Sequence, residues 1–202
     1  MAEDDAPHPP SLRGRAREAL LEAAIRCLRE KGYARTTQRD LVAASGANPR
    51  SITYHFGSKE RLMTEALGEA FRRRSVPMME ASAARGDTAA ASFAGTFAGL
   101  LAAVRADREL AFALTDAISQ ARAEDVRAPL AEHYELMRRQ GTALVEATLG
   151  DAFAEAGGDA RTLSSTLLAL FDGLVLQGLV DPDAPPAPDA LLASLRAALS
   201  VG

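Results

Sequence analysis

The chain has 202 residues with a hydrophobic content of 48%, enough to bury a sizeable core in one large domain or two small ones. Abundant Ala and Leu, with no Trp, favour closely packed helices. The single cysteine, Cys27, cannot form an intrachain disulfide, and its place on an apolar helical face indicates burial rather than redox chemistry. Neither a long apolar run nor a signal peptide is evident, so we expect a cytoplasmic protein without a membrane partner.

The net charge of −4 conceals two parts of opposite sign. Residues 11–75 hold 14 Lys and Arg against 7 Asp and Glu, whereas residues 76–202 hold 9 against 17. A basic N-terminal part in front of an acidic body suits a polyanionic partner, although solvated surfaces carry such charge as well. The charge therefore gains weight only from the motif that lies within the basic part.

The first expected helix covers residues 15–31. Residues 1–12 are acidic and Pro-rich without apolar periodicity, so we expect a disordered tail there. Apolar residues then recur every three or four positions up to Lys31, and Gly32 follows where a helix should stop. These apolar positions are Leu20, Ala23, Ala24, Cys27 and Leu28. We expect them to form the face on which the next two helices pack.

Residues 36–59 read TTQRDLVAASGANPRSITYHFGSK and contain two short helical patterns joined by a three-residue turn. Thr37 is a good N-cap with Asp40 in the capping-box position, and Gly46 suits a helix C-terminus because glycine adopts positive φ readily. Asn48 then caps a second helix that begins at Pro49, where a missing N–H costs nothing. The pattern predicts a helix-turn-helix, a DNA-reading motif. The residues expected to pack on the first helix are Leu41, Ala44, Ile52 and Phe56.

A connecting helix is expected from Ser58 and Lys59 to about Val76, with Pro77 ending or kinking it. We therefore divide the chain into the tail at 1–12, a helix-turn-helix domain at 13–57, and the connecting helix with a C-terminal domain at 58–202. The C-terminal pattern predicts helices at about 88–104, 107–122, 129–156, 161–180 and 189–199, with Pro129 in the first turn of the third and a proline-rich link at 181–188. The expected fold class is all-α.

The chain carries a spaced set of anchor residues: Arg17, Gly32-Tyr33, Thr36-Thr37, Gly46, His55-Phe56, Ser58-Lys59-Glu60 and Leu62, and further along the phrase LLALFDGLVLQGLVDP at 167–182. In these residues the N-terminal part resembles the DNA-binding domain of TetR-family transcriptional regulators. The resemblance implies a three-helix DNA-binding head, a connecting helix, and a helical body that binds a small effector and forms a homodimer.

The second helix of the motif, which begins at Pro49, is expected in the major groove with its N-terminal residues at the base edges. Arg50 is the candidate for base recognition, because its guanidinium matches the two acceptors of guanine. The shorter polar groups able to reach a base or a phosphate are Asn48, Ser51 and Thr53. The residues expected on the phosphate backbone are Thr37, Arg39, Tyr54, His55 and Lys59. His55 and Ser51 have a structural alternative, packing and solvation of the helix.

Two positions depart from the usual family pattern of Gly, Thr, an aliphatic residue and Tyr. This chain has Arg50-Ser51-Ile52-Thr53 instead, with its tyrosine one place later at Tyr54. The phosphate contact that the resemblance assigns to an aromatic side chain is therefore made either by Thr53 or by Tyr54. Arg50 adds a base-reading group that glycine lacks.

The expected helix at 161–180 is apolar on several faces, so it needs partners on more than one side. A dimer seam with part of the helix at 129–149 would supply them, and burial within its own subunit is the alternative. The seam residues proposed from the sequence are Ala143, Ala147, Leu163, Leu167, Leu170 and Leu174. Apolar stripes with a few polar neighbours suggest an effector pocket, although such stripes also form ordinary cores. The pocket candidates are Phe93, Phe97, Leu101, Leu114, Thr115, Ile118, Tyr134, Met137 and Gln177.

No P-loop, dinucleotide fingerprint, nucleophile motif or metal-ligand spacing is present, so we expect no enzyme activity, cofactor or metal. The sequence is best interpreted as a homodimeric repressor that binds a palindromic double-stranded DNA operator and is released from it by a small molecule. One alternative is a helical ligand-binding protein or enzyme that uses the head only for assembly. Another is an activator without an effector.

Overall fold

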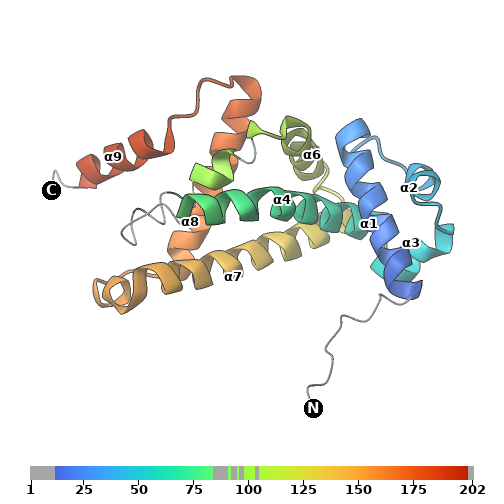
Figure 1. Ribbon diagram of the computed structural model, residues 1–202, viewed down its shortest axis with the longest axis horizontal. Coiled ribbons are helices and arrows are strands. Elements are labelled where there is room, and N and C mark those ends of the chain that lie inside the picture. The colour runs from blue at the N-terminus through green and yellow to red at the C-terminus, as the bar shows by residue number, and fades with distance from the viewer. Residues whose placement is uncertain (1–11, 84–90, 92–94, 96–97, 103–104, 200–202) are drawn as a thin grey trace, which may run out of the picture.

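The computed structural model describes residues 12–83, 91, 95, 98–102 and 105–199. Within these residues every labelled element is an α-helix, which confirms the expected fold class (Figure 1). The helices are α1 (Leu12–Lys31), α2 (Gln38–Ser45), α3 (Pro49–Phe56), α4 (Lys59–Ala83), α6 (Arg108–Ser119), α7 (Glu124–Glu155), α8 (Ala160–Val180) and α9 (Pro188–Leu199).

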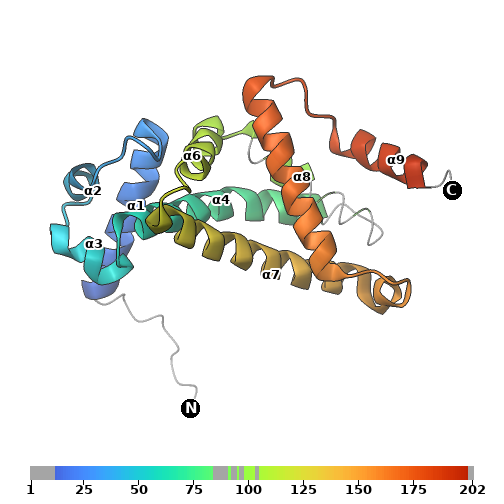
Figure 2. The same ribbon diagram turned by 180° about the vertical axis from the view of Figure 1, so that it is seen from behind.

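Helices α1, α2 and α3 gather at one end of the molecule, from which α4 and α7 run side by side toward the other end (Figures 1 and 2). The predicted boundaries of α2 and α3 are confirmed by their capping contacts. The amide of Asp40 donates to the Thr37 hydroxyl at 3.2 Å while the Asp40 carboxylate accepts from the Thr37 amide at 2.9 Å, a complete capping box. Gly46 ends α2 at φ 68°, and the Asn48 side chain accepts from the Arg50 amide at 2.9 Å.

The head has a dense core against α1. All five apolar positions expected on α1 are buried, and so are Leu41, Ile52 and Phe56. The expectation for Ala44 was wrong, because its side chain is exposed and its carbonyl accepts from the Arg26 guanidinium at 2.8 Å. Helix α2 turns Leu41 and the partly buried Val42 toward the core instead.

Helix α4 is longer than the sequence suggested, since it passes through Pro77 and ends at Ala83 rather than near Val76. Proline in a helix removes one hydrogen bond and crowds the carbonyl four residues earlier. Pro77 is exposed, so water can replace the lost hydrogen bond at this position. The connecting helix therefore reaches well into the C-terminal part of the molecule.

One hydrophobic core runs from the head into the body. Leu110, Ala113 and Ala117 of α6 and Leu130 of α7 belong to the same buried cluster as the α1 face. An ion pair between Arg29 and Asp107, 2.9 Å apart, ties the end of α1 to the start of α6. The division proposed between residues 57 and 58 is thus not marked by a break in the core.

The body is built on α7 and α8, which pack against each other, with α6 covering part of α8. Helix α7 begins five residues before Pro129, so this proline lies in the second turn rather than the first. Asp159 caps α8 by accepting from the Thr162 amide at 2.6 Å. Arg108 of α6 donates to the carbonyls of Gly178 and Leu179, both at 3.1 Å, and so satisfies the last turn of α8.

Helix α8 corrects one expectation. By length and composition alone it is apolar enough to cross a membrane, with a mean hydropathy of 1.6, although the sequence was expected to contain no such segment. Only 22% of that apolar window is buried inside the protomer. Core helices of water-soluble proteins pass the same test, and α8 packs on α7 and α6, so this signal is weak.

Candidate DNA-binding surface and ligand cavity

Helix α3 presents one face to the core and the other to solvent. Ile52 and Phe56 are buried against the head, which fixes the orientation of the helix. The residues exposed around the opposite face are Asn48, Pro49, Arg50, Thr53 and Tyr54. Ser51 and His55 are half-buried at its margins, and Arg39 of α2 is exposed nearby in the motif. A short helix held from behind, with polar side chains outward, has the form that enters a major groove.

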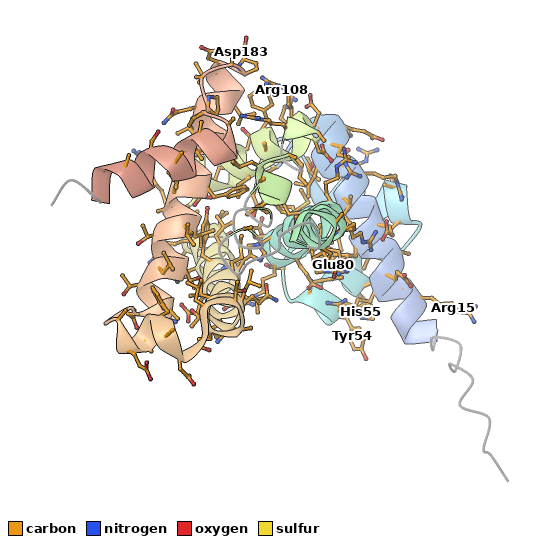
Figure 3. The ribbon with its side chains drawn as sticks, turned by 60° about the vertical axis from the view of Figure 1, so that its left-hand side comes forward. Arg15, Tyr54, His55, Glu80, Arg108 and Asp183 are labelled. Atoms are coloured by element: carbon orange, nitrogen blue, oxygen red, sulfur yellow. The ribbon has the colours of Figure 1, made fainter. Side chains whose placement is uncertain are left out.

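The aromatic group at the end of α3 is well defined. Tyr54 is 66% exposed, and its ring meets the ring of His55 edge-on with centroids 4.9 Å apart. Figure 3 shows Tyr54, His55 and Arg15 at the same end of the head. These side chains offer hydrogen-bond donors and a cation on one side of the molecule, as contacts to a phosphate backbone require.

Two residues expected to bind phosphate also hold the head together. The Thr37 hydroxyl accepts from the Asp40 amide and donates to the Asp40 carboxylate at 2.7 Å, so its capacity is used in the capping box. The Lys59 ammonium donates to the Thr36 carbonyl at 3.2 Å and pairs with Glu60 at 3.3 Å. The capping box of Thr37 was expected from the sequence, whereas the contacts of Lys59 were not. The phosphate contacts of Thr37 and Lys59 stay predictions.

Arg17 connects three helices. Its guanidinium carbon lies 4.8 Å from the centroid of the Phe56 ring on α3, a cation–π distance, and it pairs with Glu65 on α4. Arg17 belongs to the sequence resemblance, but nothing in the sequence indicated that it touches α3. Arg17 therefore lies between α3 and the rest of the molecule.

A cavity of about 650 Å³ lies among α1, α4, α7 and α8, and this volume is within the range of small-molecule sites. Most of its wall is apolar. The apolar lining residues include Leu21, Leu67, Phe71, Leu100, Leu114, Met137, Val145, Leu167, Leu168 and Phe171. Arg17 and Leu21 also line it, so the first helix of the head forms part of the cavity wall.

Polar groups of α7 and α8 meet inside this cavity. Burial raises the pKa of the Tyr134 phenol, and the neighbouring Asp172 carboxylate raises that pKa further. Burial also raises the pKa of Asp172, while its hydrogen bond with Tyr134 acts in the opposite direction. Burial lowers the pKa of the His133 imidazole, which favours its neutral form near pH 7.

Charged residues at the cavity wall are largely paired with one another. Glu65 pairs with Arg17. Glu69 accepts from Arg72 at 2.7 Å and from Arg73 at 2.6 Å, and these hydrogen bonds, that of Arg72 first, lower the pKa of Glu69 to about 2 despite its partial burial. Asp172 differs from these carboxylates, because its contact is a phenol rather than a cation.

Two glycines let the cavity walls approach closely. A Cβ atom on Gly68 of α4 would lie 2.3 Å from the His133 ring of α7. A Cβ atom on Gly141 of α7 would lie 2.3 Å from the hydroxyl of Ser164 on α8, which donates to the Arg138 carbonyl at 3.0 Å. The sequence pattern does not indicate these contacts, because each glycine lies in the middle of an otherwise ordinary helical pattern.

The pocket candidates from the sequence are only partly brought together. Leu114, Tyr134 and Met137 line the cavity. Leu101 lines a smaller cavity of about 370 Å³ beside the end of α8. The candidates that line neither cavity are Thr115, Ile118 and Gln177, and Phe93 and Phe97 lie outside the described residues.

The residues proposed for a dimer seam occupy different environments in the protomer. Ala143 and Ala147 are exposed on α7, and Leu163 is half-buried on α8. Leu167 lines the larger cavity, whereas Leu170 and Leu174 pack in a core with Phe171 and Ala111. Large apolar side chains that the sequence did not single out remain on the surface of α8, since Leu176 is 54% exposed and Val180 85%.

The structure combines a helix-turn-helix head, a long connecting helix and a helical body with a partly open cavity, an arrangement suited to a DNA-binding regulator with a ligand site. The profile of "Bacterial regulatory proteins, tetR family" matches residues 20–66, and that of "BetI-type transcriptional repressor, C-terminal" matches residues 89–200. The chain belongs to the TetR family of transcriptional regulators. This confirms the resemblance seen in the sequence.

One curated relative is similar to the head of this chain, and two solved structures share its fold. The transcriptional repressor AcnR of Corynebacterium efficiens is 45% identical over 47 residues, which are 23% of this chain and a quarter (25%) of that relative. The crystal structure of a putative TetR-family regulator from a Rhodococcus species has a TM-score of 0.68 at 21% identity, covering 91% of this chain and 97% of its own. The FadR regulator of Bacillus subtilis, crystallised with stearoyl-CoA, has a TM-score of 0.60 at 16% identity, covering 88% and 94%.

Proposed function

We propose that this TetR-family regulator is a cytoplasmic, homodimeric repressor that binds a palindromic operator and is released from it by a small molecule in the 650 Å³ cavity. One observation carries the ligand-release part of this proposal. Arg17 lines the cavity and also lies over Phe56, a core residue of the helix expected in the major groove. A ligand that displaces Arg17 therefore acts on α3 directly.

The exposed face of α3 supports operator recognition. Arg50 is exposed at its N-terminus, where we expect it to contact guanine in the major groove, and we expect the exposed Thr53, Tyr54 and Arg39 to contact neighbouring bases and phosphates. Two such heads read half-sites about 34–36 Å apart, one helical turn of DNA, so a twofold dimer matches a palindromic site. The repressor name of AcnR and the repressor-type C-terminal profile favour repression over activation.

Release follows from linkage between the two sites. A ligand weakens operator binding only by its preference for the arrangement that cannot bind DNA. FadR, which has the same fold, was crystallised with an amphipathic ligand, and the mostly apolar wall of this cavity suits an amphipathic molecule too. The long α4 helix lines the cavity and also packs against α3. A ligand that shifts α4 therefore changes the position of α3.

The operator is best identified by selecting bound duplexes from a random DNA pool with the full-length protein. We expect a palindromic site whose affinity falls steeply as salt rises, because phosphate contacts release counterions. Fluorescence anisotropy on that site then measures affinity with and without a panel of amphipathic small molecules. A protein that uses its head only for assembly would select no site. A protein whose operator affinity no compound changes would be a regulator without an effector.

A further inference from the structure

The larger cavity contains one acidic side chain that no cation neutralises in the part of the chain that the structure describes. Glu65 and Glu69 are each paired with arginine, but Asp172 forms no ion pair there and its hydrogen-bond partner is Tyr134. Asp172 is half-buried on α8, one residue after Phe171, which is buried. Within the described residues, the negative charge of the Asp172 carboxylate is therefore not balanced by a cation.

A carboxylate in such a place is costly without a partner. Transfer from water to an apolar site disfavours the charged form, and one phenol satisfies only part of the hydrogen-bonding capacity of its two oxygens. The arginines of the wall do not relieve this cost, since Arg17 and Arg72 already pair with Glu65 and Glu69. A cation supplied by a ligand would relieve it.

We infer that the effector is an amphipathic organic cation, whose ammonium group pairs with Asp172 and hydrogen-bonds near Tyr134 while its apolar part fills the cavity between α4 and α7. This inference rests on the proposed ligand-binding function and adds the chemical class of the ligand. The aliphatic and aromatic wall, from Leu67 and Phe71 to Met137, favours an apolar chain or ring system over a polar metabolite. The same carboxylate disfavours anionic ligands.

The test uses three probes of equal chain length that differ in head charge: decylammonium, decanol and decanoate. Each displaces N-phenyl-1-naphthylamine, a dye that fluoresces in apolar cavities, from the full-length protein at pH 7.5, below the probe's micelle concentration. We expect decylammonium to bind roughly tenfold more tightly than decanol, because charge-assisted hydrogen bonds are the strong ones, and decanoate to bind most weakly.

Variants assign the preference to Asp172. Asp172→Asn should reduce decylammonium affinity roughly tenfold and leave decanol affinity within about twofold. Asp183→Asn, a change of the same kind in the link after α8 and outside the lining of the larger cavity, should alter neither. Met137→Trp places a bulkier ring in the cavity wall and should weaken binding of both probes. Thermal unfolding monitored by circular dichroism shows that each variant is folded.

The outcomes separate this inference from the proposed function. Equal binding of the three probes, or an unchanged decylammonium affinity in Asp172→Asn, overturns the cationic class while ligand binding in the cavity stands. Failure of the dye and of every probe to bind the wild-type protein overturns ligand binding itself, and the inference with it. Affinities of both probes that Met137→Trp leaves unchanged place the probes elsewhere and overturn the role of Asp172.

Discussion

At the scale of single residues, the head separates side chains that build it from side chains that remain available for DNA. Arg50 is exposed at the start of α3, and its backbone amide, not its side chain, serves the Asn48 cap. Arg50→Ala should therefore lower affinity for the selected operator roughly tenfold and relax preference at one base position, as loss of a bidentate guanine contact does. Unfolding should be unchanged. Repeated selection from the random pool and anisotropy titration measure both effects.

The matched control for Arg50 is Arg139→Ala, which removes an equally exposed arginine from α7 in the body. It should leave affinity and base preference as they are. If both variants bind the operator as the wild type does, or if Arg50→Ala weakens all sequences equally, Arg50 contacts phosphate or solvent and not a base.

The raised pKa of the Asp172 carboxyl predicts how decylammonium affinity depends on pH. Because burial raises its pKa, it is neutral to a higher pH than an ordinary Asp, and decylammonium binding should strengthen as pH rises from about 4 through this raised pKa. His133 loses its proton over the same rise and acts in the same direction, whereas Tyr134, with a raised pKa, and Glu69, near 2, titrate outside the range. Dye displacement from pH 4 to 8 measures the curve. In Asp172→Asn only the smaller His133 step should remain, and an unaltered curve would contradict the assignment.

At the scale of elements, the contact between α4 and α7 depends on a missing side chain. Gly68→Ala places a methyl group 2.3 Å from the His133 ring, so α4 and α7 must separate or the ring must turn. We expect a loss of about 1–3 kcal/mol in the free energy of unfolding, the usual cost of overpacking, against which the better helix propensity of Ala gains about 1 kcal/mol. Urea unfolding measures the net change, which should be destabilising.

Two variants test this explanation of Gly68. Gly173→Ala on α8 adds a methyl group where no neighbouring helix of the protomer lies within 4 Å, so in the separated protomer the propensity gain should appear alone and increase stability. His133→Ala combined with Gly68→Ala should recover most of the lost stability. If Gly68→Ala is as stable as Gly173→Ala, then α4 and α7 accommodate the added methyl group without a loss in the free energy of unfolding.

The exposed apolar residues of α8 predict that this helix forms part of a dimer interface. Leu176 is 54% exposed on a helix that is apolar along its length, and covering it against a second copy would remove apolar area from water. Leu176→Glu should shift the protein from dimer to monomer, measured by sedimentation equilibrium. Ile118→Glu, which charges a 47% exposed apolar residue on α6 outside the proposed seam, should leave the dimer intact. A dimer that tolerates Leu176→Glu would place the seam elsewhere.

The sequence predicted features that depend on neighbouring residues along the chain, such as helix caps. It did not predict contacts between different helices. Capping residues such as Thr37 and Asn48 marked helix starts because their contacts span only two or three residues. Pro77 misled because its effect depends on exposure, which a local pattern does not contain. The sequence pattern predicted part of the cavity lining, including Tyr134 and Met137. It did not indicate Asp172, because the contact between Tyr134 and Asp172 joins two helices and does not affect the apolar periodicity of either helix.

At the scale of the whole molecule, head and body form one mechanical unit, because a single core joins α1 to α6 and α7, and the cavity wall includes α1. Arg17 is the side chain through which occupancy of the cavity meets α3, by its place over Phe56 and its pairing with Glu65. Arg17→Ala should therefore reduce the factor by which decylammonium weakens operator binding, while binding of decylammonium itself persists.

The comparison that decides the role of Arg17 is with Arg72→Ala, since Arg72 also lines the cavity and pairs with a carboxylate, Glu69, but does not contact Phe56. Operator affinity is measured for each variant with and without saturating decylammonium, and the ratio of the two affinities is the coupling. We expect that ratio to fall toward one in Arg17→Ala and to stay near the wild-type value in Arg72→Ala. Equal ratios in the two variants would mean that coupling travels along α4 or α6, because those helices also join the cavity to the core of the head and neither substitution interrupts them.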